Sequence, residues 1–166
     1  PEAGPAHINL ISQWVDCNSS SAPKKELRAQ GGTPIPGALR GVRYEYMSKI
    51  PSDNAKWCRG YYVILLTDGE PTYGIGDEGE WVGNGSTIDT LHQIESCKLE
   101  ADSLMHTHIY KENVIDTVLP IKTYVIGVGD DVGKATLDSI ASRGGTEHYY
   151  PAMNPEELQE VLRAIV

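Results

Sequence analysis

The sequence has little that would place it in a membrane or on nucleic acid. No apolar run approaches the roughly 20 residues that a helix needs to cross a bilayer. Basic residues are scarce, since 14 Lys and Arg stand against 23 Asp and Glu and give a formal net charge of -9. Because the phosphates of nucleic acid require a basic surface, we expect no nucleic-acid partner. The acidic balance suits cations or basic protein partners, although many soluble domains are mildly acidic for solubility alone.

Cysteine is also scarce, with only Cys17, Cys58 and Cys97. No C-x-x-C spacing occurs, which argues against a zinc site. In a secreted protein, one disulfide and one thiol, or a bond to polypeptide outside these residues, would be the default. In a cytosolic protein, all three would be small buried residues. Composition alone leaves both alternatives open.

The 166 residues are enough for one domain with a core of its own. Hydrophobic residues make up 40% of the chain and charged residues 22%, so the chain is neither disordered nor fibrous. Predicted strands cover Tyr61–Thr67, Ile121–Val128 and, more weakly, Glu147–Tyr150. Predicted helices cover Ile8–Val15, Ile35–Met47, Ile88–Met105, Asp131–Ser142 and Pro155–Ile165. The alternation of strands and helices predicts an α/β layer fold with a mainly parallel sheet.

Two of the predicted helices carry clear local signals. In Ile88–Met105, apolar residues recur at spacings of three and four and form one stripe, made of Leu91, Ile94, Cys97, Ala101 and Leu104. In the last helix, Asn154 is the expected N-cap, Pro155 the first helical residue and Glu157 the capping-box partner.

The strand Tyr61–Thr67 is apolar on both faces, which is typical of a central strand covered by helices. Only three strands are recognisable, however, so this strand would lie near an edge of the sheet. We therefore expect the N-terminal strands of the domain to be missing from this chain and to lie upstream. The glycine-rich, acidic loop Pro71–Thr87 is long enough to predict a functional or mobile segment.

The predicted strand Tyr61–Thr67 ends in Asp68 and Gly69, where an acidic turn replaces the apolar run. In an open parallel sheet, ligands collect at the carboxyl ends of the strands, so Asp68 is a candidate ligand-binding residue. Upstream, Thr33 lies between two glycines and Pro34, which restricts the position of its hydroxyl.

Gly-Gly-Thr-Pro before a helix, followed by a strand that closes on Thr-Asp-Gly, resembles a von Willebrand factor type A (VWA) domain. The later segments IKTYVIGVGDD and GGTEHYY and the terminal amphipathic helix agree with this resemblance, which covers about Ile8 to Val166. It implies a three-layer, doubly wound, Rossmann-like fold, of which residues 1–166 would be the C-terminal portion of a single domain. Each motif is weak alone, but their order along these elements makes the resemblance specific.

The VWA family binds one divalent cation, Mg²⁺, Mn²⁺ or Ca²⁺, at a metal-ion-dependent adhesion site. The resemblance implies that Thr33 and Asp68 are metal ligands. The family's first ligand motif, Asp-x-Ser-x-Ser at the end of a strand, has no true match here. Asp16, Asn18 and Ser20 imitate its spacing but follow a helical pattern, so we expect the true motif upstream. With only part of the ligand set, the chain alone should bind metal poorly.

Other interpretations of these motifs are simpler. Asp68-Gly69 is a common turn dipeptide, and Glu70 is expected to be solvated. The acidic residues of the loop 71–87 lack the EF-hand spacing. The segment Gly127–Ala135 lacks the Gly-Lys-Ser/Thr of a phosphate loop, and His106 and His108 are expected at a solvated helix end. We expect two tryptophans, Trp14 and Trp57, to be packed and Trp81 to lie in the loop.

The leading functional interpretation is a non-enzymatic binding module in a secreted or cell-surface protein, periplasmic in transit. It would recognise an acidic side chain of a protein ligand through the cation. The run WCRGYYVILLTDGEP is similar to the A domains of type IV pilus tip adhesins, which implies a role in attachment.

One alternative is an intracellular VWA domain of an ATP-driven metal-insertion or remodelling complex. A disulfide among the three cysteines would favour the extracellular interpretation, and three thiols the intracellular one. A further alternative is an enzyme that uses Asp68 as acid or nucleophile, although no general base accompanies it. Hydrolase assays of the Asp68→Asn variant would test that alternative.

Overall fold

A small parallel sheet organises the computed structural model, which describes residues 33–72, 74–75, 81–82, 87–111, 114–130 and 132–165. Its strands are β1 (Tyr61–Thr67), β6 (Ile121–Val128) and β7 (Tyr150–Ala152), in the order β1-β6-β7. β6 pairs in parallel with both neighbours, and Thr67 of β1 is level with Gly127 of β6. The prediction of an α/β fold with a parallel sheet is confirmed, and β7 begins where the predicted third strand ends.

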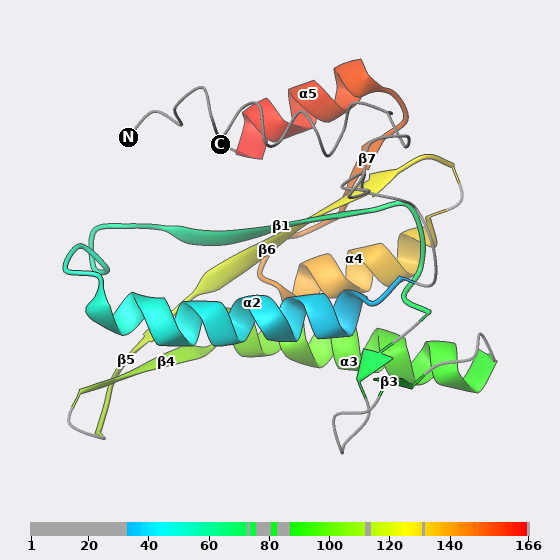
Figure 1. Cartoon of the computed structure of the whole chain (residues 1–166). Helices are drawn as coiled ribbons and strands as arrows, with labels where there is room; N and C mark the ends of the chain where they lie inside the picture. The colour runs from blue at the N-terminus through cyan, green and yellow to red at the C-terminus, as the bar shows by residue number, and fades with distance from the viewer. Residues whose placement is uncertain are drawn as a thin grey trace, which may run out of the picture. The chain divides into compact units, whose positions relative to one another are not determined.

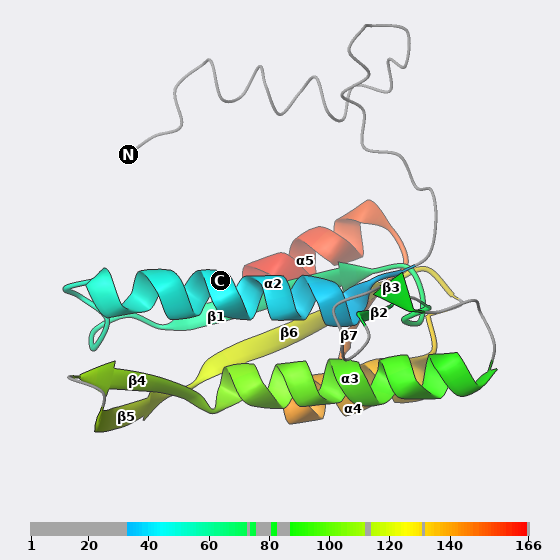
Figure 2. The ribbon, with the colours of Figure 1, turned by 60° about the horizontal axis from the view of Figure 1, so that its bottom comes forward.

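Helices cover both faces of this sheet (Figures 1 and 2). α2 (Ile35–Lys49), α3 (Thr87–Met105) and α4 (Lys134–Arg143) lie on one face, and α5 (Pro155–Ile165) lies against β7 on the other. A short 3-10 helix, Ile50–Ser52, follows α2. The arrangement is compatible with a Rossmann-like α/β fold. Among the described residues, no helix is long and apolar enough to cross a membrane.

Two antiparallel strand pairs were not predicted from the sequence. β2 (Gly74–Ile75) pairs with β3 (Trp81–Val82), inside the segment that was expected to be a loop. β4 (Thr107–Lys111) pairs with β5 (Val114–Leu119), which leads through Pro120 into β6. His108 therefore lies in a strand rather than at a helix end. These strands are short, and short runs of alternating polarity are the weakest signals in a sequence.

The predicted helix boundaries hold to within a few residues, except at the start of α4. α4 begins at Lys134, not at Asp131, because Gly133 adopts a left-handed conformation before it. The predicted cap of α5 is confirmed: the Glu157 N–H donates to Asn154 Oδ1 over 2.9 Å, and Asn154 Nδ2 donates to Glu157 Oε1 over 2.7 Å. The predicted helix Ile8–Val15 lies outside the described residues.

The hydrophobic core lies between the sheet and the layer of α2, α3 and α4. Its central side chains come from every one of these elements and include Leu39, Leu104, Ile121, Val125, Leu137 and Ile140. The apolar stripe predicted for α3 is partly wrong, because Leu91 is 59% exposed. Gln93 and Glu100 are buried instead, at 4% and 6% exposed. The buried face of α3 is therefore rotated relative to the predicted stripe.

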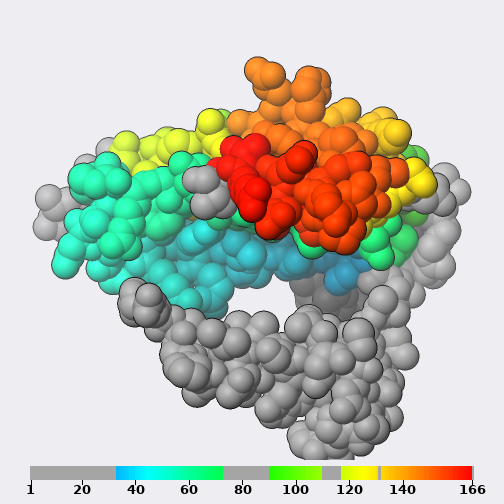
Figure 3. Space-filling view, turned by 90° about the horizontal axis from the view of Figure 1, so that it is seen from above, coloured from blue at the N-terminus to red at the C-terminus, as the bar shows by residue number. Residues whose placement is uncertain are grey.

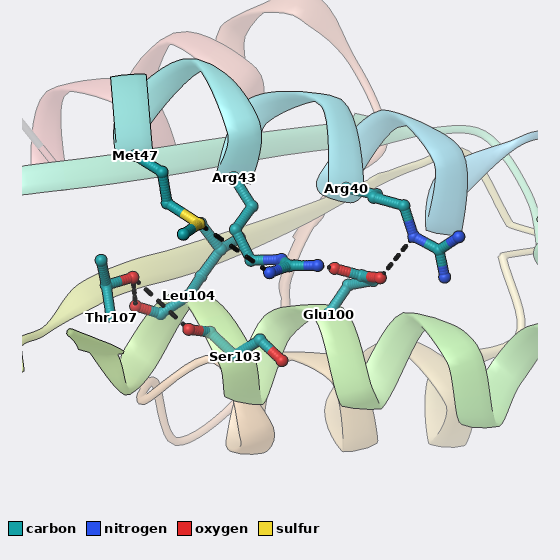
Figure 4. Close-up of polar contacts among 7 residues, drawn as sticks. All are labelled: Arg40, Arg43, Met47, Glu100, Ser103, Leu104 and Thr107. Atoms are coloured by element: carbon teal, nitrogen blue, oxygen red, sulfur yellow. Dashed lines mark hydrogen bonds and ion pairs between the residues drawn. The ribbon is translucent and has the colours of Figure 1, made fainter. Parts of the chain in front are cut away.

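Glu100 is buried because two arginines of α2 neutralise it (Figure 4). Arg40 Nε lies 2.6 Å from Glu100 Oε1, and Arg43 Nε lies 2.8 Å from Oε2. Both carboxylate oxygens thus accept a charge-assisted hydrogen bond, which offsets the cost of removing the charge from water. This cluster joins α2 to α3 across 57 to 60 residues of sequence.

β1 is an edge strand whose outer side and outward face remain open within the described residues. Tyr62, Ile64 and Leu66 point away from the core and are 52%, 41% and 53% exposed. α5 covers only part of this side of the molecule, and atoms of the segment around β1 are visible beside it (Figure 3). No residue of α5 is fully buried. Trp57, just before β1, is 52% exposed, so the expectation that it packs is wrong.

Candidate site at the carboxyl edge of the sheet

Asp68 lies immediately after the last residue of β1, at the carboxyl edge of the sheet, and its side chain is exposed. The turn is fixed by Thr67, whose hydroxyl donates to the Gly69 carbonyl over 2.9 Å and accepts from the Gly69 N–H over 3.3 Å. The inward side chain of Thr67 thus holds the backbone of the turn. Asp68 lies within this hydrogen-bonded turn and is exposed.

Thr33 lies beside the segment that follows Asp68, although it is far away in the sequence. The Thr33 N–H donates to Thr72 Oγ1 over 2.7 Å, and the Thr72 N–H donates to the Thr33 carbonyl over 3.2 Å. The same carbonyl accepts from the Ile35 N–H over 3.0 Å, where α2 begins. These bonds tie Thr33 to Thr72, four residues after Asp68 in the segment that follows β1.

The neighbouring strand contributes a further acidic residue to this edge. β6 ends at Val128, and the Gly129 N–H then donates to the Ala152 carbonyl of β7 over 3.1 Å, with a φ of 92° that favours glycine. Asp130 follows and is exposed. Because β1 and β6 are parallel and end at the same edge, Asp68 and Asp130 both lie at the carboxyl edge of the sheet.

Glu70 does not lie free in solvent, so that expectation is wrong. Its Oε1 accepts a hydrogen bond from Thr136 Oγ1 of α4 over 2.7 Å, and the residue is half-buried. Sequence reasoning missed Thr72 and Thr136 as parts of this site. Thr72 follows β1 and Thr136 lies in the first turn of α4, and only the fold shows that they meet Thr33 and Glu70.

The oxygen-rich composition of this edge suits a hard cation, which prefers carboxylate and hydroxyl oxygens. Asp68 makes no hydrogen bond to another described residue. Thr33 is hydrogen-bonded to Thr72 through its backbone N–H and carbonyl. Within the described part of the chain, no group of three or more His, Cys, Asp and Glu side chains is placed to hold a metal ion. Two oxygen side chains fit such an ion only as part of a larger ligand set.

Several predicted features lie outside the described residues, namely Trp14, Asp16, Cys17, Asn18, Ser20 and the acidic loop residues Asp77, Glu78 and Glu80. The other cysteines are described, and both are free thiols: Cys58 is exposed and Cys97 is buried. Burial raises the pKa of the Cys97 thiol well above its usual range, so this thiol stays protonated and unreactive.

Comparison with known proteins adds no relative. No protein-family model matches the chain, and no curated protein or solved structure matches it significantly.

Proposed function

We propose that this chain is the C-terminal portion of a VWA domain that binds a protein ligand through a divalent cation at the carboxyl edge of its sheet. The observation that carries the proposal is the pairing of Thr33 with Thr72. It ties a threonine that precedes α2 to Thr72, four residues after Asp68, across 39 residues of sequence. The order of the motifs along the chain supports the same interpretation.

The chemistry follows from the donor atoms. The Asp68 carboxylate and the Thr33 hydroxyl would contribute hard oxygen ligands to Mg²⁺, Mn²⁺ or Ca²⁺. A hydroxyl and a single carboxylate leave a dication under-neutralised, so an acidic side chain of a partner protein is attracted to it. Exchange of a bound water for that carboxylate would be the binding event.

The remaining ligands would come from a strand that pairs with the open edge of β1. Within the described ranges, three features suit a further strand in this position: the unpaired outer side of β1, the exposed face of Tyr62, Ile64 and Leu66, and an α5 without a fully buried residue. An edge strand with apolar side chains on both faces exposes apolar surface and unpaired backbone groups to water, which is unfavourable. A strand ending in Asp-x-Ser-x-Ser would cover this edge and complete the ligand set.

As a biological role, we propose attachment through a secreted or cell-surface protein, of the kind found at type IV pilus tips. The similarity of residues 57–71 to those adhesins supports this role. The net charge of -9 also suits a surface that attracts cations. The intracellular alternative is distinguished by counting thiols in the protein isolated without reductant.

The metal site is tested with Asp68→Ala and Thr33→Val in the complete domain, meaning this chain together with the strand expected upstream. Each variant should lower the affinity for Mn²⁺ by at least about tenfold, because Thr33→Val removes an oxygen ligand and Asp68→Ala removes a carboxylate that reaches the ion directly or through water. Isothermal titration calorimetry measures the affinity, and circular dichroism confirms that the fold is retained.

Glu147→Gln is the matched control, since Glu147 is an exposed acid that precedes β7 and lies toward the opposite edge of the sheet. Its Mn²⁺ affinity should equal that of the wild type. Unchanged affinity in both site variants would refute the assignment of Thr33 and Asp68.

A further inference from the structure

Among the described residues, Glu70 is an acidic side chain close to Asp68 in sequence that is tied to another element. It follows Asp68 by two residues, yet its carboxylate reaches across to the start of α4 and accepts the Thr136 hydroxyl over 2.7 Å. The two residues are 66 positions apart in the sequence. The contact therefore joins the segment after β1 to the helix that follows β6.

The start of α4 is shaped to receive this carboxylate. Gly133 precedes the helix with a φ of 58° and provides no side-chain cap. A Cβ at this position would lie 2.3 Å from both Cγ and Oε1 of Glu70, so a side chain here would displace the carboxylate from its present position. A negative charge at a helix N-terminus is also favoured by the helix dipole. The Glu70 carboxylate thus lies against the first turn of α4, where it accepts the Thr136 hydroxyl.

We propose that Glu70 is a positioning residue that holds the segment 68–72 against α4 and so fixes the Asp68 carboxylate. The inference rests on the proposed metal site. Thr67 fixes the start of this segment through Gly69, and Thr33 fixes its end through Thr72. The contact between Glu70 and Thr136 fixes its middle and couples it to α4. Movement at the start of α4 would therefore move Asp68.

The first test follows amide hydrogen exchange in the metal-free chain, so its result does not depend on metal binding. Thr136→Val keeps the shape of the side chain and removes the donor to Glu70. Exchange in the peptide covering 68–72 should become about tenfold faster, the factor expected when one hydrogen bond to a charged group is lost. Thr136→Ser keeps the hydroxyl and should restore the wild-type rate.

Ser139→Ala is the matched control, because its hydroxyl lies on the same helix and donates only to the Thr136 carbonyl over 2.7 Å. This variant should leave exchange in 68–72 unchanged. Unchanged exchange in Thr136→Val, or equal acceleration in Ser139→Ala, would overturn the proposal.

The second test measures Mn²⁺ affinity in the complete domain. Thr136→Val should weaken binding by about tenfold, as expected for loss of a residue that supports a ligand, and Thr136→Ser should restore it. If Thr136→Val binds as tightly as wild type, or more tightly, while Asp68→Ala loses binding, Glu70 does not position Asp68 and the inference fails. If Asp68→Ala also binds normally, the metal site itself is wrong, and the positioning role is wrong with it.

Discussion

At the scale of single residues, the Glu100 cluster places a charged carboxylate in the interface between α2 and α3. The Glu100 side chain is only 7% exposed, whereas those of Arg40 and Arg43 are 32% and 24% exposed. The arginines can be rehydrated if the pair is broken, but the carboxylate cannot. Removal of the positive charges should therefore cost more stability than removal of the negative one.

The double variant Arg40→Met, Arg43→Met should lower the free energy of unfolding by about 3–5 kcal/mol, because it leaves an unpaired carboxylate in the interface of α2 and α3. Adding Glu100→Met should recover most of that loss, since a buried ion cluster replaced by apolar residues is often neutral. Urea denaturation measures both effects.

Glu45→Gln is the control for this pair of variants. Glu45 forms an exposed ion pair with Lys49 of the same helix at 2.7 Å. Its loss should leave the urea midpoint close to that of the wild type, because an exposed ion pair contributes little to stability. An Arg40, Arg43 double variant as stable as this control would contradict the account of the cluster.

Predictions for single residues were confirmed where the partner of the residue is close to it in the sequence. The Asn154 cap was predictable because its partner Glu157 is three residues away and belongs to the same helix. The roles of Glu70 and Glu100 were not predictable, because their partners lie 66 and up to 60 residues away. An acidic residue looks solvated in a sequence until the fold brings a donor or a cation to it.

At the scale of elements, the long apolar strand and the long periodic helices were predictable, and the short hairpins were not. Tyr61–Thr67 matched β1 because an uninterrupted apolar run has few alternatives in this fold class. The third strand was predicted at Glu147–Tyr150, whereas β7 spans Tyr150–Ala152. Its three residues include a proline and show almost no alternation of apolar and polar side chains, so the sequence did not indicate its position. For the site, the position of Asp68 followed from the strand end, and the approach of Thr33 followed only from the resemblance.

The outward face of β1 provides a test at this scale. In the chain alone, Ile64→Ser with Leu66→Ser should change the free energy of unfolding by less than about 1 kcal/mol, because both side chains are already exposed. In the complete domain the same change should cost about 3 kcal/mol or more, since an added segment would bury both side chains. Urea denaturation of the two proteins measures the difference.

The matched control is Leu99→Ser, because Leu99 is 67% exposed on α3, away from the open face. Its effect should be small in both proteins. An equal cost of the β1 substitutions with and without the upstream segment would show that nothing covers this face.

At the scale of the whole molecule, the proposed binding of a divalent cation distinguishes the carboxyl edge of the sheet from the opposite edge. The opposite edge, where Tyr61 and Ile121 begin their strands, is separated from it by the length of β1. Seven residues of strand span about 20 Å at about 3.3 Å per residue. The two edges are therefore far enough apart to be distinguished by a paramagnetic ion.

The most direct measurement is the NMR line broadening caused by Mn²⁺ in the ¹⁵N-labelled complete domain. Paramagnetic broadening falls with the sixth power of distance. The account predicts that the amide signals of Gly69, Thr72 and Gly129 disappear at substoichiometric Mn²⁺, while those of Tyr61 and Ile121 persist. Selective loss of the Tyr61 and Ile121 signals, or equal broadening at both edges, would contradict it.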